Sequence, residues 1–223
     1  MRIETIYHEA IPAWTETKKI YSFDELDPEV QEKVIDREYN SVDIDFICED
    51  WSESVKAIAE LIGARYTYEV GPCSYNHLQF KSYDEPEEEV EGIRAMAWIQ
   101  NNWIDKAYEG KYFSTPFKQC EKSPEHPAGV TFKKRISAII LELDNCPFTG
   151  MCYDCNFSNT WNRFKQGIRN GKKLTVGDFV EGLEQNLLND ICSEIDYRYS
   201  REGLIEEITA RGSEFYANGE EVF

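Results

Sequence analysis

Apolar residues recur along this chain with two periods, one of three or four residues and one of two. The longer period starts near Asp43 or Asp45 and stops at Gly63, which predicts a helix with one apolar face made of Ile47, Trp51, Val55, Ile58 and Ile62. A four-residue spacing after Thr175 predicts a second long helix, with Phe179, Leu183, Leu187, Ile191 and Ile195 inward. Thr175 is the expected N-cap of this helix, and Asp178 occupies the capping-box position.

The two-residue period covers Arg65 to Tyr83 and predicts a β-hairpin. Tyr66, Tyr68 and Val70 alternate with polar residues, and Leu78 and Phe80 resume the alternation after a turn at Gly71-Pro72. The connection between the two strands is longer than a tight turn requires. Two interpretations remain open for it: an ordinary turn, or an exposed functional loop whose candidate residues are Tyr75, Asn76 and His77.

Weaker patterns complete an α+β prediction. Further helices are expected at 28–39, 90–108, 159–169 and 200–212, whereas 131–143 fits either a helix or a buried strand. We expect five or six helices packed on a small antiparallel sheet, formed by the hairpin, the C-terminal strand and the strand before Phe23. The expected organisation is a single compact domain over 1–223. Its alternative is a subdivision into 1–113 and 131–223, because the Pro- and Gly-containing connection between them lacks apolar periodicity.

Three stretches carry a resemblance to a known family. The first is Tyr-Ser-Phe-Asp-Glu-Leu at 21–26 followed by Gln-x-Lys-x-x-Ile, where Asp27 is a good N-cap and Pro28 suits the first helical position. It resembles the N-terminal signature of a family of bacteriophage and prophage proteins. The loop at 146–154 is similar to that family's Cys-Pro-x-Thr-Gly-x-Cys-x-Asp loop, and the end of the chain is similar to its Phe-x-x-x-Gly finish. The resemblance implies a phage-encoded protein and supplies no catalytic residues, although some members are labelled antitoxin of a toxin-antitoxin stability system.

The charge of the chain bears on its partners. With 24 basic and 42 acidic residues the net charge is −18, so we do not expect direct sequence-specific binding to DNA or RNA. One interpretation of the charge is solubility alone; the other is an acidic surface that occupies the basic groove of a nucleic-acid enzyme. The candidate partner-binding residues lie on three elements: Glu49, Asp50 and Glu53; Asp84, Glu85, Glu87, Glu88, Glu89 and Glu91; and Glu181, Glu184, Asp190 and Glu194. Lys165, Arg169, Lys172 and Lys173 form the contrasting basic spot.

Metal and redox chemistry have one candidate site. Cys146, Cys152 and Cys155 place three thiols in one loop, and Cys120 or His126 would supply a fourth zinc ligand. Only one Cys-x-x-Cys pair is present, so the favoured reading is free thiols and no cofactor, with zinc and redox chemistry as the alternatives. The three histidines lie far apart, and no nucleophile, phosphate-loop or dinucleotide motif occurs. We therefore expect a protein that is not an enzyme.

The start of the chain lacks a signal-peptide pattern, and no stretch has the roughly 20 apolar residues of a membrane span. The sequence thus predicts a cytoplasmic protein that does not contact membranes, and the phage resemblance implies that the cell is a bacterial host. The leading hypothesis is a phage-encoded acidic protein that binds and inhibits a host nucleic-acid-processing or defence enzyme, as anti-CRISPR and anti-restriction proteins do. The alternatives are an antitoxin that neutralises a protein toxin, and a small metal module or undetected enzyme centred on the three cysteines.

Overall fold

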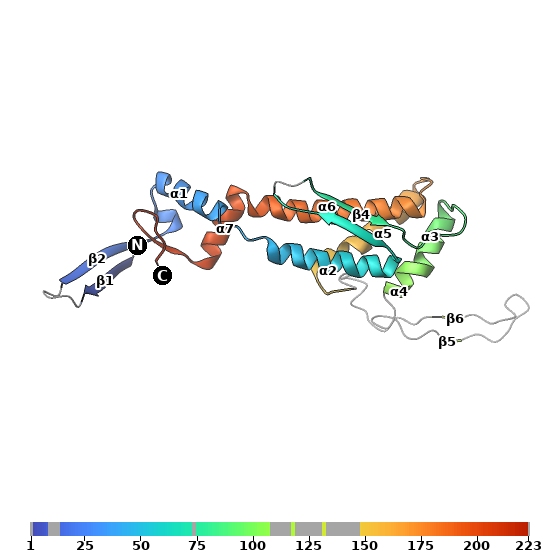
Figure 1. The fold of residues 1–223 in the computed structure, drawn as a ribbon, viewed down its shortest axis with the longest axis horizontal. Helices are drawn as coiled ribbons and strands as arrows, with labels where there is room; N and C mark the ends of the chain where they lie inside the picture. The colour runs from blue at the N-terminus through green and yellow to red at the C-terminus, as the bar shows by residue number, and fades with distance from the viewer. Residues whose placement is uncertain are drawn as a thin grey trace, which may run out of the picture. The chain divides into compact units, whose positions relative to one another are not determined.

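A computed structural model describes residues 2–8, 14–72, 75–107, 117–118, 131–132 and 148–222, with side chains over 18–72, 75–107 and 148–222. The chain forms two compact units. The first unit joins Met1–Ile44 to Ser193–Phe223, and the second is Asp45–Cys192. Figure 1 shows the elements of each unit, coloured along the chain.

The first unit is built from the two ends of the chain. Its antiparallel sheet has the strand order β1 (Arg2–His8), β2 (Trp14–Ser22) and β7 (Glu214–Tyr216). After the short turn η1 (Phe23–Glu25), the chain enters α1 (Pro28–Tyr39), and α7 (Arg201–Arg211) precedes β7. The core of this unit consists of Phe23, Leu26, Val34, Ile35, Leu204, Ile208 and Phe215.

Capping residues place the helices of the first unit where the sequence predicts them. Asp27 occupies the N-cap position of α1, where its backbone carbonyl, and not its side chain, accepts from the Val30 and Gln31 N–H groups, and Pro28 is the first helical residue. The Ser200 hydroxyl accepts a hydrogen bond from the Gly203 N–H at the start of α7, and Gly212 ends that helix with φ +66°. The stretch that carries the N-terminal resemblance is therefore a strand-to-helix junction whose Phe23 and Leu26 are buried in the core.

The second unit packs its helices against a β-hairpin. Its elements are α2 (Asp45–Ile62), β3 (Arg65–Glu69), β4 (His77–Lys81), α3 (Ile93–Ile99), η2 (Gln100–Ile104), α4 (Asp105–Ala107), β5 (Phe117–Lys118), β6 (Thr131–Phe132), η4 (Cys152–Asp154), α5 (Cys155–Arg169) and α6 (Val176–Arg198), of which α6 contributes its residues up to 192. Helices α2 and α6 lie side by side (Figure 1), and the Trp51 indole N–H of α2 donates to the Leu187 carbonyl at 2.9 Å.

The apolar faces predicted for α2 and α6 form the core of this unit. Every predicted inward residue of the two helices is buried, and all of them except Ile195 belong to this unit. Phe179 lies at the centre of an aromatic cluster in which its ring centroid is 5.7–6.3 Å from those of Phe157, Trp161, Phe164 and Trp103. The start of α6 is the predicted capping box: Asp178 accepts from the Thr175 N–H and hydroxyl, and the Asp178 N–H donates to that hydroxyl.

The α+β class is confirmed, but the prediction of one common sheet is wrong. The hairpin β3–β4 forms its own two-stranded sheet, with the register Tyr66↔Phe80, apart from the β1–β2–β7 sheet. Side chains and turns occupy the edges that a common sheet would need. The Phe80 N–H of β4 donates to the Glu184 carboxylate at 2.5 Å, and β7 is bonded on one side by β2 and on the other by residues 220–222.

The helix predicted from Val90 starts later than expected. Residues 84–90 have no regular structure, and α3 begins at Ile93 after Gly92, which has φ +60°. The helical run continues through the π-helical segment η2. Ile93 and Ala97, predicted inward, are exposed, whereas Ala95, Ile99 and Trp103 are buried.

Some predictions fall on parts of the chain outside the described residues. These are the choice between helix and strand for 133–143 and most of the irregular connection at 111–130. The single-domain organisation also stays a prediction. The helix predicted to start at Asn159 begins at Cys155. Within the described residues, the helices are all too short or too polar to cross a membrane.

Candidate functional site

The acidic segment, residues 84–91, is held at both ends by backbone hydrogen bonds within the second unit. The Asp84 N–H donates to the Ile62 carbonyl at the end of α2 at 2.9 Å. At the other end, the Gly92 N–H donates to the Leu174 carbonyl at 2.8 Å, and Glu91 pairs with Thr175 in an isolated antiparallel bridge. The segment therefore lies between the end of one helix and the start of another.

Asp84 also packs closely against the turn that ends α2. Gly63 has φ +69°, and a Cβ placed there would lie 2.7 Å from the Asp84 carboxyl carbon. Glycine satisfies both the left-handed backbone and the close approach. Asp84 is thus held against the end of α2 by its side chain as well as its backbone. The exposed carboxylates that follow it in the sequence start from this anchored residue.

A cavity of about 510 Å³ lies between the acidic segment and the first turn of α6. The carboxylates of Glu85, Glu87 and Glu89 line it, and the buried Val90 contributes an apolar wall. The remaining lining residues are Tyr83, Pro86, Thr175, Val176 and Gly177. Three carboxylates and a phenol thus surround one hollow, an arrangement suited to a positively charged side chain.

Electrostatics explain why so many carboxylates gather here. The N-terminus of a long helix carries a partial positive charge that favours nearby anions. The sequence predicts this effect for the helix after the acidic segment, but the structure provides it at α6. Burial, together with Glu85 and Glu184, raises the pKa of the Tyr83 hydroxyl, so the phenol keeps its proton near neutral pH and presents an O–H donor.

The acidic segment dominates the charge of the second unit. Residues 45–192 contain 16 basic and 23 acidic residues, a net charge of −7. Six of these acidic residues and no basic residue lie in 84–91. All six are exposed, and Glu91 forms an ion pair with Lys173 at 3.0 Å. The rest of the unit is close to neutral, so its negative charge is concentrated on this one segment.

The other predicted acidic residues have more local roles. Glu49, Asp50 and Glu53 lie in the first half of α2, where Glu53 contacts Lys56 at 3.4 Å. On α6, Glu181 is exposed, and Asp190 accepts a hydrogen bond from the Asn156 amide at 2.8 Å. Glu194 belongs to the first unit and forms an ion pair with Arg198 at 2.9 Å. Glu85, Glu87 and Glu89 are thus the predicted residues that line one cavity together.

Glu184 supports the structure at the edge of β4. Burial raises the pKa of its carboxyl above the ordinary value of 4.5, and the nearby Glu181 raises it further. The hydrogen bond from the Phe80 N–H lowers the pKa and offsets only part of this increase. The folded state therefore binds the Glu184 proton more tightly than the unfolded state does. Protonation of Glu184 thus stabilises the fold, and this stabilisation is fully present below pH 4.5. It is lost as the pH rises through the raised pKa of the folded state.

Replacement of Glu184 with glutamine is expected to remove this pH dependence, since a glutamine oxygen still accepts the Phe80 N–H bond and has no charge to bury. The free energy of unfolding of the wild type relative to Glu184→Gln should fall as the pH rises from below 4.5 to neutral. Urea unfolding across this range measures it, with the exposed Glu60→Gln as control. A constant difference between wild type and Glu184→Gln at all pH values would contradict the assignment.

The loop candidates 75–77 combine an exposed side chain with structural contacts. Tyr75 is 88% exposed. Asn76 shapes the turn, because its side-chain oxygen accepts the Gly71 N–H at 2.9 Å. His77 is the first residue of β4 and pairs with Glu69. Only Tyr75 is thus presented freely to a partner.

The loop after residue 147 is organised by a buried carboxylate. Asp154 is fully buried and accepts hydrogen bonds from the N–H groups of Phe148, Thr149 and Gly150 at 2.7–3.0 Å and from the Thr149 hydroxyl at 3.0 Å. Gly150 has φ +86°, which favours glycine. The Thr, Gly and Asp that carry the second resemblance therefore build the loop itself.

The metal prediction rests partly on residues outside the described ones. Cys146, Cys120 and His126 belong to that group. Cys152 is exposed, and Cys155 begins α5 with its sulfur accepting from the Asn159 amide at 3.8 Å. Among the side chains that the structure describes, no three His, Cys, Asp or Glu residues are grouped to hold a metal ion.

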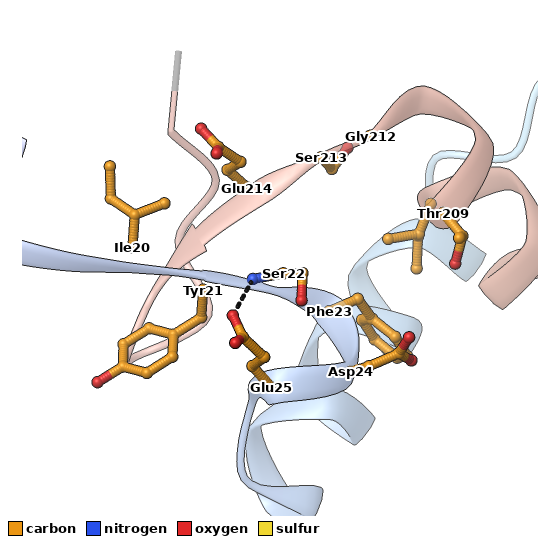
Figure 2. Close-up of a pocket in the computed structure, with 11 residues that line it drawn as sticks. Ile20, Tyr21, Ser22, Phe23, Asp24, Glu25, Thr209, Gly212, Ser213 and Glu214 are labelled. Atoms are coloured by element: carbon orange, nitrogen blue, oxygen red, sulfur yellow. Dashed lines mark hydrogen bonds between the residues drawn. The ribbon is translucent and has the colours of Figure 1, made fainter. Parts of the chain in front are cut away.

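The first unit contains a cavity of about 430 Å³ at the strand-to-helix junction. Figure 2 shows its lining, drawn from β2 and η1 on one side and from the α7–β7 connection on the other. The Ser22 N–H donates to the Glu25 carboxylate at 3.2 Å, and Asp24 and Glu214 add further carboxylates. The residues of the first resemblance thus line a polar hollow as well as supporting the core.

Sequence reasoning missed two parts of the acidic cavity, Tyr83 and the start of α6. The helix breakers Pro86 and Gly92 were the available signal that residues 84–92 form a loop rather than a helix. Nothing local in the sequence indicates that this loop lies against Thr175. Comparison of the chain with family models, curated proteins and solved structures found no match.

Proposed function

We propose that this chain is a non-enzymatic binding protein that uses the acidic segment 84–91 to occupy a basic surface of a protein partner. The partner class that fits this chemistry is a nucleic-acid-processing or defence enzyme, whose phosphate-binding groove is rich in Lys and Arg. An acidic ligand in that groove excludes the polynucleotide, so binding and inhibition are the same event. The proposal makes the protein an inhibitor of the anti-CRISPR or anti-restriction type.

The observation that carries the proposal is the concentration of charge on an anchored loop. Six exposed carboxylates lie within eight residues, while the remainder of the unit is nearly neutral. Hydrogen bonds at both ends hold the segment before a partner arrives. A pre-organised loop loses less conformational freedom on binding than a flexible acidic tail would.

The cavity beside the segment supplies a site for a single basic side chain. Glu85, Glu87 and Glu89 surround it, and the Tyr83 ring adds a flat aromatic group. Arginine is enriched at the energetic centres of protein interfaces, and its guanidinium binds both carboxylates and aromatic faces. We therefore place a partner arginine in this hollow.

Capture from a bacterial lysate tests the proposal. The full chain, immobilised by a terminal tag, is compared with the variant Glu85→Gln, Glu87→Gln, Glu89→Gln. The matched control is Asp196→Asn, Glu202→Gln, Glu207→Gln, which removes the same charge from exposed positions of the first unit. We expect wild type and control to retain the same protein and the segment variant to lose it. Equal retention by both variants would contradict the role of the acidic segment.

A further inference from the structure

The stretch 155–177 has the opposite charge to the rest of the protein. It contains five basic residues, Arg163, Lys165, Arg169, Lys172 and Lys173, and no acidic residue, within a chain of net charge −18. The stretch comprises α5, the turn at Asn170-Gly171 and the cap of α6. A positive region this long in so acidic a protein indicates an anionic ligand more readily than it indicates solubility.

Two of these cations line a shallow groove between α5 and α6, with a volume of about 250 Å³. Arg163 belongs to α5, and Lys172 follows the turn after it. Three of the other groups at the groove are neutral and polar: Thr160, Gln185 and Asn186. Such a volume is below the roughly 300–1,000 Å³ of pockets for drug-sized ligands, so it suits a small anion.

A chain of hydrogen bonds fixes Arg163 at this groove. Its guanidinium donates to the Asn186 side-chain oxygen at 2.6 Å. The Asn186 amide donates to the Thr160 hydroxyl at 2.7 Å, and that hydroxyl donates to the Asn156 carbonyl, also at 2.7 Å. The acceptor of Arg163 is thus neutral, and the guanidinium keeps its full charge and further N–H donors.

Carboxylates do not neutralise the groove. Within the described part of the chain, neither Arg163 nor Lys172 forms an ion pair. The one carboxylate of the lining, Asp178, is bonded to the N–H and hydroxyl of Thr175 in the helix cap. Glu184 bonds to Phe80 of β4 instead. Two unpaired cations in a protein with surplus carboxylates point to a negative charge supplied from outside.

We propose that the groove between α5 and α6 binds a phosphate group, free or as a small phosphomonoester, through Arg163 and Lys172. Arginine offers paired N–H donors that match phosphate oxygens, and lysine adds a point charge. This site is separate from the acidic segment and does not depend on the function proposed for it.

Titration of the full chain with inorganic phosphate, followed by NMR at constant ionic strength, tests the site. We expect saturable shifts at Arg163 and around the groove in the wild type. Arg163→Gln and Lys172→Gln should each weaken binding roughly tenfold, because each removes a charge-assisted contact. Arg169→Gln is the matched control on the same helix, outside the groove, and should change the affinity by less than about twofold.

Lys172→Gln keeps the test decisive if Arg163→Gln disturbs folding, because within the described residues the Lys172 side chain makes no hydrogen bond or ion pair and its backbone N–H bond to the Gly167 carbonyl survives the substitution. A parallel titration with glycerol phosphate separates the two sources of the group: tighter binding than inorganic phosphate assigns a phosphomonoester, and equal binding assigns free phosphate. Absence of saturable binding to the wild type, or equal weakening by Arg169→Gln, would overturn the proposal.

Discussion

Replacement of Asp154 with alanine is expected to lower the free energy of unfolding of the second unit by about 3–5 kcal/mol. The carboxylate is fully buried and accepts four hydrogen bonds from residues 148–150. Alanine removes the acceptor of all four bonds, and the N–H groups of the half-buried Phe148 and Thr149 then lose their partner at a costly position. Urea unfolding monitored by tryptophan fluorescence measures the change.

Asp154→Asn provides a graded comparison. Asparagine keeps one oxygen acceptor and places an N–H₂ group against donors, so its loss of stability should lie between those of wild type and Asp154→Ala. Asp196→Ala serves as the control for removal of an exposed carboxylate. An Asp154→Ala protein as stable as Asp196→Ala would show that this carboxylate does not organise the loop.

The second large effect is expected at Gly203 in α7. A Cβ built at this position would overlap the backbone carbonyl oxygen of Tyr197. Because backbone atoms at a helix junction cannot rotate away as a side-chain end can, Gly203→Ala should cost about 3 kcal/mol despite the higher helix propensity of alanine. The expected result is a lower unfolding midpoint of the first unit in a thermal scan.

Gly182 in α6 offers the same substitution without the clash. A Cβ there would lie 3.5 Å from the Thr160 Cγ2 atom, an ordinary van der Waals distance. Gly182→Ala should therefore be neutral or stabilise the second unit by about 0.5–1 kcal/mol. Similar losses of stability from both glycine substitutions would refute the close approach at Gly203.

Local rules predicted much of the fold because its helices carry their own start and stop signals. Thr175 with Asp178, Asp27 with Pro28, and Gly212 act within one helical turn, so sequence alone identifies them. The separation of the sheets depends on contacts distant in sequence, such as that between Phe80 and Glu184, which no local pattern encodes. The later start of α3, at Ile93 after Gly92, likewise placed Ala95 and Ile99 inward instead of the predicted Ile93 and Ala97.

The sequence predicts which residues form the candidate site, but it does not predict where they lie in the fold. The carboxylate run 84–91 stands out in the sequence, and its exposure follows from its charge. Its position against the start of α6 arises from the Gly92–Leu174 bond, which joins residues more than eighty positions apart. The residues of the anion groove could not be predicted from the sequence either. Of the basic spot predicted at 165–173, Lys172 lines the groove, whereas Lys173 forms an ion pair with Glu91.

The most direct test of the acidic segment is the salt dependence of its affinity for the protein that the wild-type chain captures. We expect a dissociation constant that rises steeply with ionic strength, and we expect DNA or RNA to compete for the same partner. The variant Glu85→Gln, Glu87→Gln, Glu89→Gln should bind on the order of tenfold more weakly at low salt, and its affinity should change less with salt. An affinity that does not change with salt, and is equal for wild type and variant, would contradict the proposed role of the segment.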